Sequence, residues 1–261
     1  MQRTLIQPDV HAIPEAFHPL LSGAPVYDSS CSPEARVLFI DRDEGYFLKS
    51  APKGSLEAEA KMTAYFHQKG LGAEVLAYES LERDWLLTAR IPGEDCTHAD
   101  MLAQPERLCD VLGERLRMLH ELDVSGCPVQ DRMAGYRALA AENHRTGNYD
   151  QSQFPDSFGY ASAQEAWAVV ERSGHLLKSD TLIHGDYCLP NVMLRDWRFT
   201  GFIDVGNGGV GDRHVDLFWG AWTLGFNLKT DRYAPRFLDA YGRDRVDTGL
   251  LRVVAAFEVF G

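Results

Sequence analysis

Short apolar runs in the first third of the chain predict strands arranged around one helix. Turn-forming residues at 42–44 separate the first two runs, which is typical of a hairpin. Residues 55–69 predict the helix, because Met62, Tyr65 and Phe66 recur there at helical spacing. The pattern therefore predicts strands over residues 36–41, 45–49, 74–78 and 84–89.

Beyond this region the pattern becomes mainly helical. The sequence Ile91-Pro92-Gly93 interrupts the strands, and residues 108–119 then carry an apolar stripe with a period near 3.6. Further helices are expected over residues 161–177 and 232–240, with short strand-like pieces between 181 and 205. We expect an α+β fold in two lobes. Residues 1–90 would form a small β-rich, nucleotide-binding lobe, and residues 91–261 a larger, mainly helical lobe for catalysis and acceptor binding.

Charge and cysteine content narrow the class of protein. The 261 residues include 38 acidic and 26 basic side chains, a net charge of −12. This balance argues against nucleic-acid binding, which needs a basic surface. It suits a cationic small substrate, although an acidic surface also serves solubility. The five cysteines form no CxxC pair and indicate neither a disulfide framework nor a zinc site. With no apolar signal segment and no membrane-length apolar run, we expect a cytoplasmic protein without a membrane partner.

One stretch of the sequence carries the chemistry. It begins His184-Gly185-Asp186, places Asn191 five residues after the aspartate, and continues into an apolar strand. A second aspartate, Asp204, follows 13 residues after Asn191 and opens an Asp-x-Gly turn. This order of Asp, Asn and Asp-x-Gly is typical of protein-kinase-like enzymes.

Phosphoryl transfer explains why these residue types are needed. The reaction asks the protein for positioning and charge neutralisation more than for covalent chemistry. A carboxylate beside the acceptor hydroxyl orients it and takes its proton, a role that fits Asp186. Mg²⁺ prefers oxygen ligands and needs few of them from the protein, which suits Asn191 and Asp204. The sequence therefore predicts transfer of a phosphoryl group from a magnesium-bound nucleoside triphosphate to a small-molecule hydroxyl.

The chain also resembles a known family, the aminoglycoside 3'-phosphotransferases, within the wider group of protein-kinase-like small-molecule phosphotransferases. The resemblance covers nearly the whole chain from about residue 25. It implies a protein-kinase-like two-lobed fold, ATP as donor, Mg²⁺, an aminoglycoside acceptor and antibiotic resistance. The segments that carry the resemblance are residues 31–36, 47–49, 119–122 with 127–128, 184–194 and 199–216.

The resemblance implies roles for residues on the nucleotide side. Lys49 matches the lysine that contacts the α- and β-phosphates, and Glu59 matches its ion-pair partner. Ser32 lies where other kinases have a glycine-rich loop, and its hydroxyl could cap the phosphates. Phe47 would pack against adenine, and the hinge residues Ala89 and Ile91 would offer it backbone groups. Asp186 matches the catalytic aspartate, and Asn191 and Asp204 match the magnesium ligands.

The acceptor side departs from the family. Where the family binds polyamine-like sugars through several carboxylates, this chain keeps only Asp150, Asp156 and Glu258. Asn207 stands where the family has an arginine, and residues 219–227 are aromatic where acids are expected. A kinase of another small alcohol, such as a macrolide, choline or a sugar, therefore remains open. A kinase-like binding protein without turnover is disfavoured, because Lys49, Asp186, Asn191 and Asp204 are all present. We expect His184, Asp212 and Asp216 to support the loop.

Overall fold

A computed structural model describes residues 3–31, 35–151 and 158–261 of the chain. Two of the predicted site residues, Ser32 and Asp156, lie outside the described residues. The chain divides into two compact units, which we describe separately. The first comprises Met1–Asp95 with Met193–Gly206, and the second comprises Cys96–Val192 with Asn207–Gly261.

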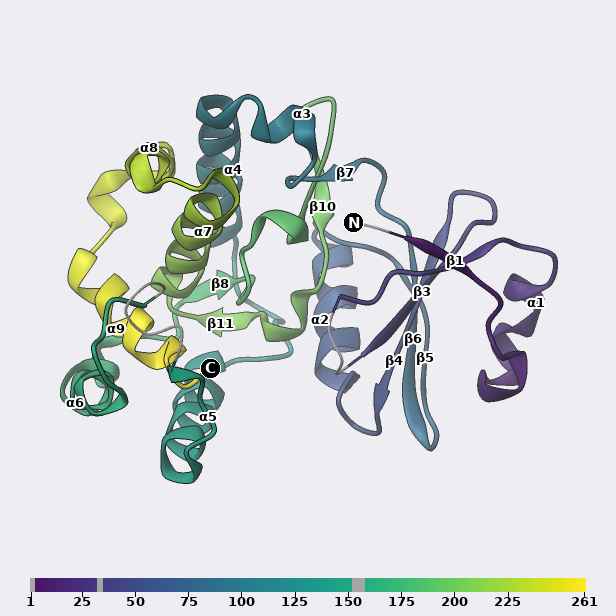
Figure 1. Cartoon of the computed structure of the whole chain (residues 1–261), viewed down its shortest axis with the longest axis horizontal. Coiled ribbons are helices and arrows are strands. Elements are labelled where there is room, and N and C mark those ends of the chain that lie inside the picture. The colour runs from purple at the N-terminus through teal and green to yellow at the C-terminus, as the bar shows by residue number, and fades with distance from the viewer. Residues whose placement is uncertain (1–2, 32–34, 152–157) are drawn as a thin grey trace. The chain divides into compact units, whose positions relative to one another are not determined.

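The first unit is built on an antiparallel sheet, with the strand order β1-β2-β3-β4-β6-β5 (Figure 1). The expected hairpin is present: Phe39 on β3 pairs with Phe47 on β4. Its turn closes through a 2.8 Å bond from Gly45 N–H to the Arg42 carbonyl. The strands are β1 (Thr4–Ile6), β2 (Val26–Asp28), β3 (Arg36–Ile40), β4 (Tyr46–Pro52), β5 (Val75–Ser80) and β6 (Arg83–Ala89).

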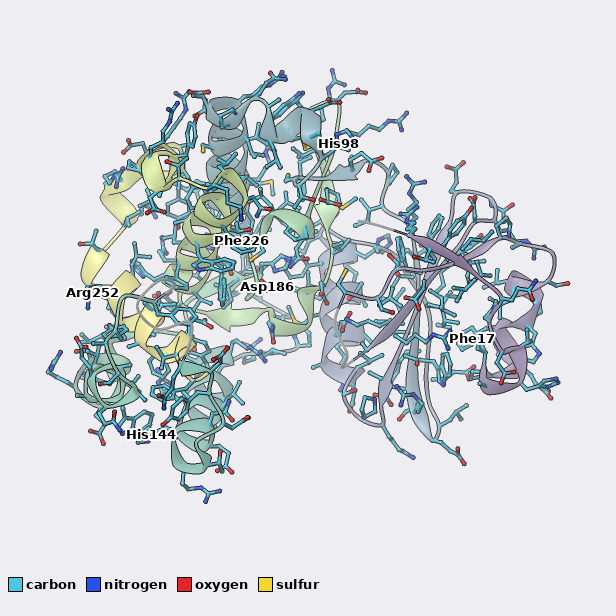
Figure 2. All side chains as sticks on the ribbon, viewed as in Figure 1. Phe17, His98, His144, Asp186, Phe226 and Arg252 are labelled. Carbon is cyan, nitrogen blue, oxygen red and sulfur yellow. The ribbon has the colours of Figure 1, made fainter. Side chains whose placement is uncertain are left out.

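The two faces of this sheet are covered by different helices. Side chains alternate along a strand, so Leu48 and Lys49 on β4 point to opposite faces. Leu48 faces a core that is closed by Phe17 (labelled in Figure 2) and Leu21, from the short helices η2 (Glu15–Phe17) and α1 (His18–Leu21). The other face packs against the predicted helix, α2 (Glu57–Gln68). Lys49 therefore lies on the face of the sheet that α2 covers.

Residues 193–206 belong to the first unit because of a small second sheet, in which β9 (Val192–Arg195) lies between β7 (Glu94–Asp95) and β10 (Arg198–Phe202). Glu94 pairs with Leu194, and Phe202 N–H donates to the Leu71 carbonyl at 2.7 Å. The sequence predicts this segment in the second lobe, whereas the structure places it in the first unit. The functional division at residue 90 stays a prediction.

The second unit is mainly helical, with a two-stranded sheet of β8 (Thr181–Ile183) and β11 (Gly209–Gly211). Helices α4 and α8 pack so closely that a Cβ at Gly113 would lie 2.7 Å from Ala240 Cβ. Within the described ranges, no helix is long and apolar enough to cross a membrane. The helices are α3 (Ala99–Leu102), α4 (Pro105–His120), α5 (Arg132–Thr146), α6 (Ala163–Ser173), α7 (Arg213–Leu228), α8 (Ala234–Tyr241) and α9 (Thr248–Glu258).

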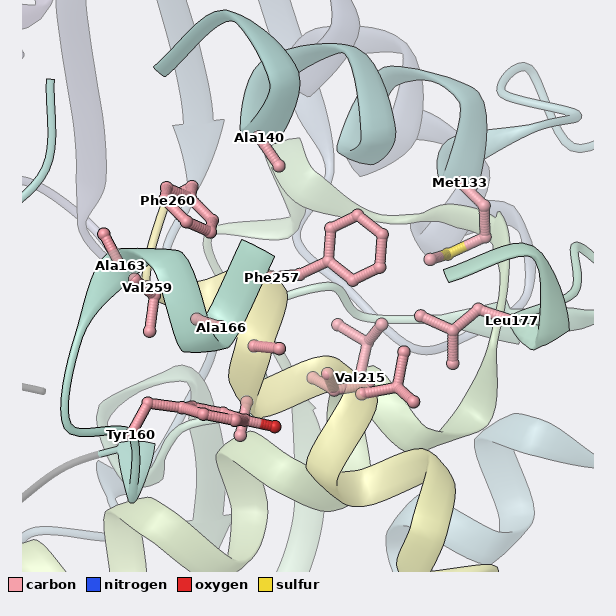
Figure 3. Close-up of a cluster of buried hydrophobic side chains, with 14 of the residues drawn as sticks. Met133, Ala140, Tyr160, Ala163, Ala166, Leu177, Val215, Phe257, Val259 and Phe260 are labelled. Carbon is pink, nitrogen blue, oxygen red and sulfur yellow. The ribbon is translucent and has the colours of Figure 1, made fainter. Parts of the chain in front are cut away.

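The core of the second unit forms around the C-terminal helix (Figure 3). Phe257 and Phe260 are buried there with Met133 from α5, Tyr160 and Leu177. Helix α9 contacts α5, α6 and α7. Side-chain caps fix where several helices begin, because Asp131, Ser162, Asp212 and Asp247 accept bonds from the first-turn N–H groups of α5, α6, α7 and α9. Burial of Phe257 and Phe260 in this core holds α9 against α5, α6 and α7.

Candidate active site

Lys49 lies at the centre of an acidic cluster in the first unit. Its Nζ donates to Glu59 Oε1 at 2.9 Å and Oε2 at 2.8 Å, and to Asp204 Oδ1 at 2.9 Å. Glu59 is delivered by the first turn of α2, and Asp204 by the segment after β10. The expected pairing of Lys49 with Glu59 is therefore present. Asp204, which the sequence predicts as a metal ligand, is a second acidic partner of Lys49.

Burial and charge act together on this cluster. Burial lowers the pKa of Lys49, but the carboxylates of Asp204 and Glu59 outweigh it, so the pKa lies above its ordinary value. Burial also raises the pKa of Glu59, with Lys49 opposing the shift and Asp204 adding to it. Lys49 is therefore held as a cation, which is the state that binds phosphate oxygens.

Asp204 is held in an uncommon backbone conformation. Its φ is +58°, in the left-handed region that non-glycine residues adopt rarely. The side chain is 53% exposed although its Oδ1 reaches Lys49. Gly206 follows closely, and a Cβ there would lie 3.2 Å from Glu59 Cβ. Strain of this kind concentrates at functional sites, and here it holds the carboxylate beside the lysine while leaving it accessible.

The loop after β8 carries Asp186 and Asn191 in the second unit, where Asp186 is labelled in Figure 2. The side-chain Nδ2 of Asn191 donates to Asp186 Oδ2 at 2.9 Å and to the Asp186 backbone carbonyl at 3.0 Å. Cys188 N–H donates to that same carbonyl at 2.8 Å. The loop is thus closed on itself, with one carboxylate oxygen held by the amide.

Asp216, on α7, binds the backbone at the start of this loop. Its carboxylate is fully buried and accepts from His184 N–H at 2.7 Å and from Gly185 N–H at 2.8 Å. His120 approaches Oδ2 through Nε2 at 3.1 Å, and its Nδ1 lies 2.9 Å from the Tyr241 hydroxyl. Burial lowers the pKa of His120 despite the pull of Asp216. Neutral His120 therefore donates from Nε2 and accepts at Nδ1.

Gly185 can only be a glycine. Its φ is +82°, and a Cβ there would lie 1.9 Å from the Asn207 carbonyl oxygen. The side-chain Oδ1 of Asn207 accepts from Arg132 Nη2 at 2.5 Å. Asn207, predicted to face the acceptor, thus packs its backbone against Gly185 at the start of the loop that carries Asp186, and its amide oxygen against Arg132.

The residues predicted to bind adenine, Phe47, Ala89 and Ile91, all belong to the first unit. Phe47 is half-buried beside Phe39, with 5.2 Å between ring centroids. Ala89 pairs with Tyr46 across β4 and β6, and its N–H donates to the Glu74 carbonyl at 3.0 Å. Ala89 therefore cannot donate to adenine without losing that bond. The Ile91 side chain is buried.

Glu258, predicted to bind the acceptor, is half-buried at the end of α9. Its Oε1 accepts from Tyr136 Oη at 2.6 Å and from Trp219 Nε1 at 3.0 Å. Burial raises the pKa of this carboxyl to about 7, against these two hydrogen bonds and with a contribution from Asp186. Asp150 is exposed. The sequence did not indicate Tyr136 or Trp219 as partners, because three distant segments must meet to form the cluster.

The sheet with its lysine–glutamate pair and the helical unit with its Asp–Asn loop have the architecture of protein-kinase-like phosphotransferases. The chain belongs to the phosphotransferase enzyme family, whose family model matches residues 30–254. The expected fold class and the expected enzyme class are both confirmed.

Several relatives are similar over almost the whole chain. A probable aminoglycoside 3'-phosphotransferase from Lactococcus lactis subsp. lactis is 48% identical over 254 residues, 97% of each chain. A solved aminoglycoside-3'-phosphotransferase of type VIII superposes with a TM-score of 0.81 at 25% identity, covering 97% of each chain. An aminoglycoside phosphotransferase from Streptomyces rimosus, solved with ADP and streptomycin, gives a TM-score of 0.69 at 22% identity. It covers 97% of this chain and 99% of that one, and at this identity the likeness shows the fold alone.

Proposed function

We propose that this protein transfers the γ-phosphate of ATP to a hydroxyl of an aminoglycoside, as a 3'-phosphotransferase that confers antibiotic resistance. The observation that carries the proposal is the position of Lys49, whose Nζ is bonded to both Glu59 and Asp204. A lysine in an ordinary structural ion pair needs only one acidic partner. Here the second acid is strained and exposed, as a group that faces a ligand would be. Relatives named for this activity support the substrate class.

On the donor side, Lys49 binds the α- and β-phosphates as a point charge while Glu59 fixes its position. Lysine serves this role in kinase-like sites because the transferring group carries dispersed negative charge. Phe47 packs against adenine, and the Ala89 carbonyl and Ile91 backbone are the hinge groups left to contact its edge. Ser32 caps the phosphates. ATP, rather than another triphosphate, is the proposed donor.

The proposed metal is Mg²⁺, and the residues present fit it. The side-chain Nδ2 of Asn191 donates both of its hydrogen bonds to Asp186, so the side-chain oxygen of Asn191 is the group that can bind the ion. Asp204 offers an exposed carboxylate. One amide oxygen and one carboxylate are the few hard donors that Mg²⁺ takes from protein in such enzymes. When bound, the ion neutralises phosphate oxygens and aligns them.

On the acceptor side, Asp186 orients the substrate hydroxyl and accepts its proton. The hydrogen bond from Asn191 keeps Oδ2 in place, so the carboxylate does not have to reorganise during transfer. Glu258 binds an ammonium group of the acceptor, with Asp150, Asp156 and Asn207 as further contacts. The partners are thus a nucleoside triphosphate and a cationic small molecule, with neither nucleic acid nor membrane. Since ATP is the donor, we place the reaction in the cytoplasm.

ATP consumption in the presence and absence of Mg²⁺ tests this proposal. The acceptor panel would contain kanamycin, neomycin, a macrolide, choline and a simple sugar. We expect magnesium-dependent turnover with at least one aminoglycoside and none with the other acceptors. Turnover only with another alcohol would reject the aminoglycoside assignment. Nucleotide binding without any turnover would indicate a kinase-like binding protein.

A further inference from the structure

Four aromatic side chains follow one face of α7, and we call them the aromatic stripe: Phe218, Trp219, Trp222 and Phe226. Trp219 meets Trp222 edge to face, with 5.3 Å between centroids, and Trp222 stacks on Phe226 at 5.1 Å with an interplanar angle of 10°. Phe226 is 56% exposed and Trp222 is half-buried. Because these rings pack against one another, they are already ordered before a ligand binds. The entropy cost of ordering side chains on binding is therefore lower.

The stripe begins at a carboxylate. Trp219 Nε1 donates to Glu258 Oε1 at 3.0 Å, and the charge of Asp186 contributes to the raised pKa of Glu258. Glu258 therefore lies within electrostatic range of the proposed catalytic base. An acceptor held near Asp186 would meet this acid at one end of the stripe and exposed rings at the other.

Helix α7 is also fixed to the catalytic loop. Asp216 bonds the backbone of His184 and Gly185, and Thr223 Oγ1 accepts from Leu189 N–H at 3.3 Å. These anchors lie on the same helix as the stripe, one turn or less from Trp219 and Trp222. The rings are thereby held in register with the loop that carries Asp186. Figure 2 labels both Asp186 and Phe226 in this unit.

The exposed end of the stripe already binds an ammonium group. Lys229 Nζ lies 4.2 Å from the centroid of the Phe226 ring. Lys229 has a φ of +56° as the residue after α7, which turns the chain at that point. Cations are attracted to the face of an aromatic ring, and tryptophan gives the strongest attraction. The internal contact shows that the chemistry of this surface suits an amino group.

We propose that the aromatic stripe is the acceptor-binding surface for an amino sugar. The exposed edges of Trp222 and Phe226 contact the apolar face of a sugar ring, and an ammonium group of the acceptor replaces Lys229 Nζ over the Phe226 ring. In this arrangement the rings supply affinity beside the carboxylate of Glu258. The inference rests on the proposed function and names residues that select its acceptor.

Three variants and one control test this inference. Trp222→Ala and Phe226→Ala remove rings from the stripe, and Trp222→Phe keeps one. Leu139→Ala is the matched control, since Leu139 is 51% exposed on α5 of the same unit, outside the stripe. Steady-state kinetics would give the KM for kanamycin and neomycin and, separately, the KM for ATP. Tryptophan fluorescence would report acceptor binding directly.

Loss of a ring contact with a cation should raise the acceptor KM about 3- to 30-fold in each alanine variant. The ATP KM should stay unchanged, Trp222→Phe should retain most of the affinity, and the control should match wild type. Kanamycin should quench the fluorescence of wild type more than that of Trp222→Phe. Unchanged acceptor KM in both alanine variants would overturn the inference and leave the proposed function standing.

Other outcomes separate the inference from the function on which it rests. If wild type turns over no aminoglycoside, the proposed function fails, and the occupant named for the stripe fails with it. If wild type turns over a macrolide alone and the alanine variants raise its KM, the stripe binds an acceptor but the amino-sugar assignment is overturned. A rise in the ATP KM to the same extent as the acceptor KM would indicate a structural role only and would also overturn the inference.

Discussion

The side-chain amide of Asn191 donates to Oδ2 of Asp186 at 2.9 Å. One residue predicted to hold a metal thus also positions the residue predicted to act on the acceptor. The bond fixes the rotamer of the carboxylate and turns the amide hydrogens of Asn191 toward the loop. The oxygen of the amide is then the group with which Asn191 can bind a cation.

The metal assignment predicts the behaviour of two variants. Asn191→Ala and Asp204→Ala should each raise the Mg²⁺ concentration for half-maximal activity by about 10- to 100-fold, the effect of losing one charge-assisted contact. A Mg²⁺ titration at saturating ATP and acceptor measures this. Asp100→Ala, at an exposed aspartate on α3, is the control. Half-saturation unchanged in both variants would remove these residues from the metal site.

The cluster around Lys49 predicts a loss of nucleotide binding. Lys49→Ala should raise the ATP KM by about 10- to 100-fold through loss of a charge-assisted contact, while the acceptor KM changes little. Glu59→Gln should have a smaller effect in the same direction, since Asp204 still holds the lysine. Lys61→Ala, on the exposed i,i+4 pair with Glu57 on the same helix, is the control. An ATP KM equal to that of the control would contradict the assignment.

The hydrogen bonds that Asp216 accepts predict that its substitution lowers the stability of the fold. In Asp216→Asn, the amide cannot accept from His184, Gly185 and His120 as the carboxylate does, so buried donors lose their partner. Each buried donor left unpaired should lower the free energy of unfolding by about 1–3 kcal/mol. Urea denaturation followed by circular dichroism measures it, with Asp244→Asn as an exposed control. A loss below about 1 kcal/mol, the range of exposed pairs, would show that the network contributes little.

Local patterns explain which elements could be predicted. The hairpin of β3 and β4 and helix α2 are encoded by alternation and by helical spacing within a few residues. The Asp186–Asn191 loop could be recognised because its motif is contiguous in sequence. The Lys49–Glu59 pair was expected from the resemblance alone, since one residue lies on a strand and the other on a helix. The roles of those residues come from chemistry and resemblance, and they stay predictions.

Elements that depend on distant pairing could not be predicted. Strand β1 pairs with β2 across some twenty residues. The segment of β9 and β10 joins the first unit through the pairing of β9 with β7 and through the bond from Phe202 N–H to the Leu71 carbonyl. Helix α5 has few apolar positions and shows no clear stripe, since its buried residues are Met133, Ala140 and Asn143. The environment of Glu258 depends on Tyr136 and Trp219, which no local pattern links.

The raised pKa of Glu258 predicts a dependence on pH. Below its ordinary value of 4.5 the carboxyl is protonated in both folded and unfolded chains, whereas up to about 7 the folded chain keeps the proton. The contribution of Glu258 to stability is therefore greatest at low pH and falls as pH rises through that window. An ammonium group binds the deprotonated form, so the acceptor KM should fall as pH rises through about 7. Glu258→Gln should raise the acceptor KM at pH 8 and flatten this profile. A profile identical to wild type would exclude Glu258 as an acceptor ligand.

The most direct test of the account is the transfer of phosphate to kanamycin by wild type and by Asp186→Ala, followed by ³¹P NMR of the product. We predict a phosphomonoester of kanamycin with wild type, formed only with Mg²⁺ and ATP. In Asp186→Ala, kcat should fall by about 10²- to 10⁴-fold, the usual contribution of a positioned base, with the ATP dissociation constant unchanged. A variant that keeps more than a third of wild-type kcat would contradict the role of Asp186.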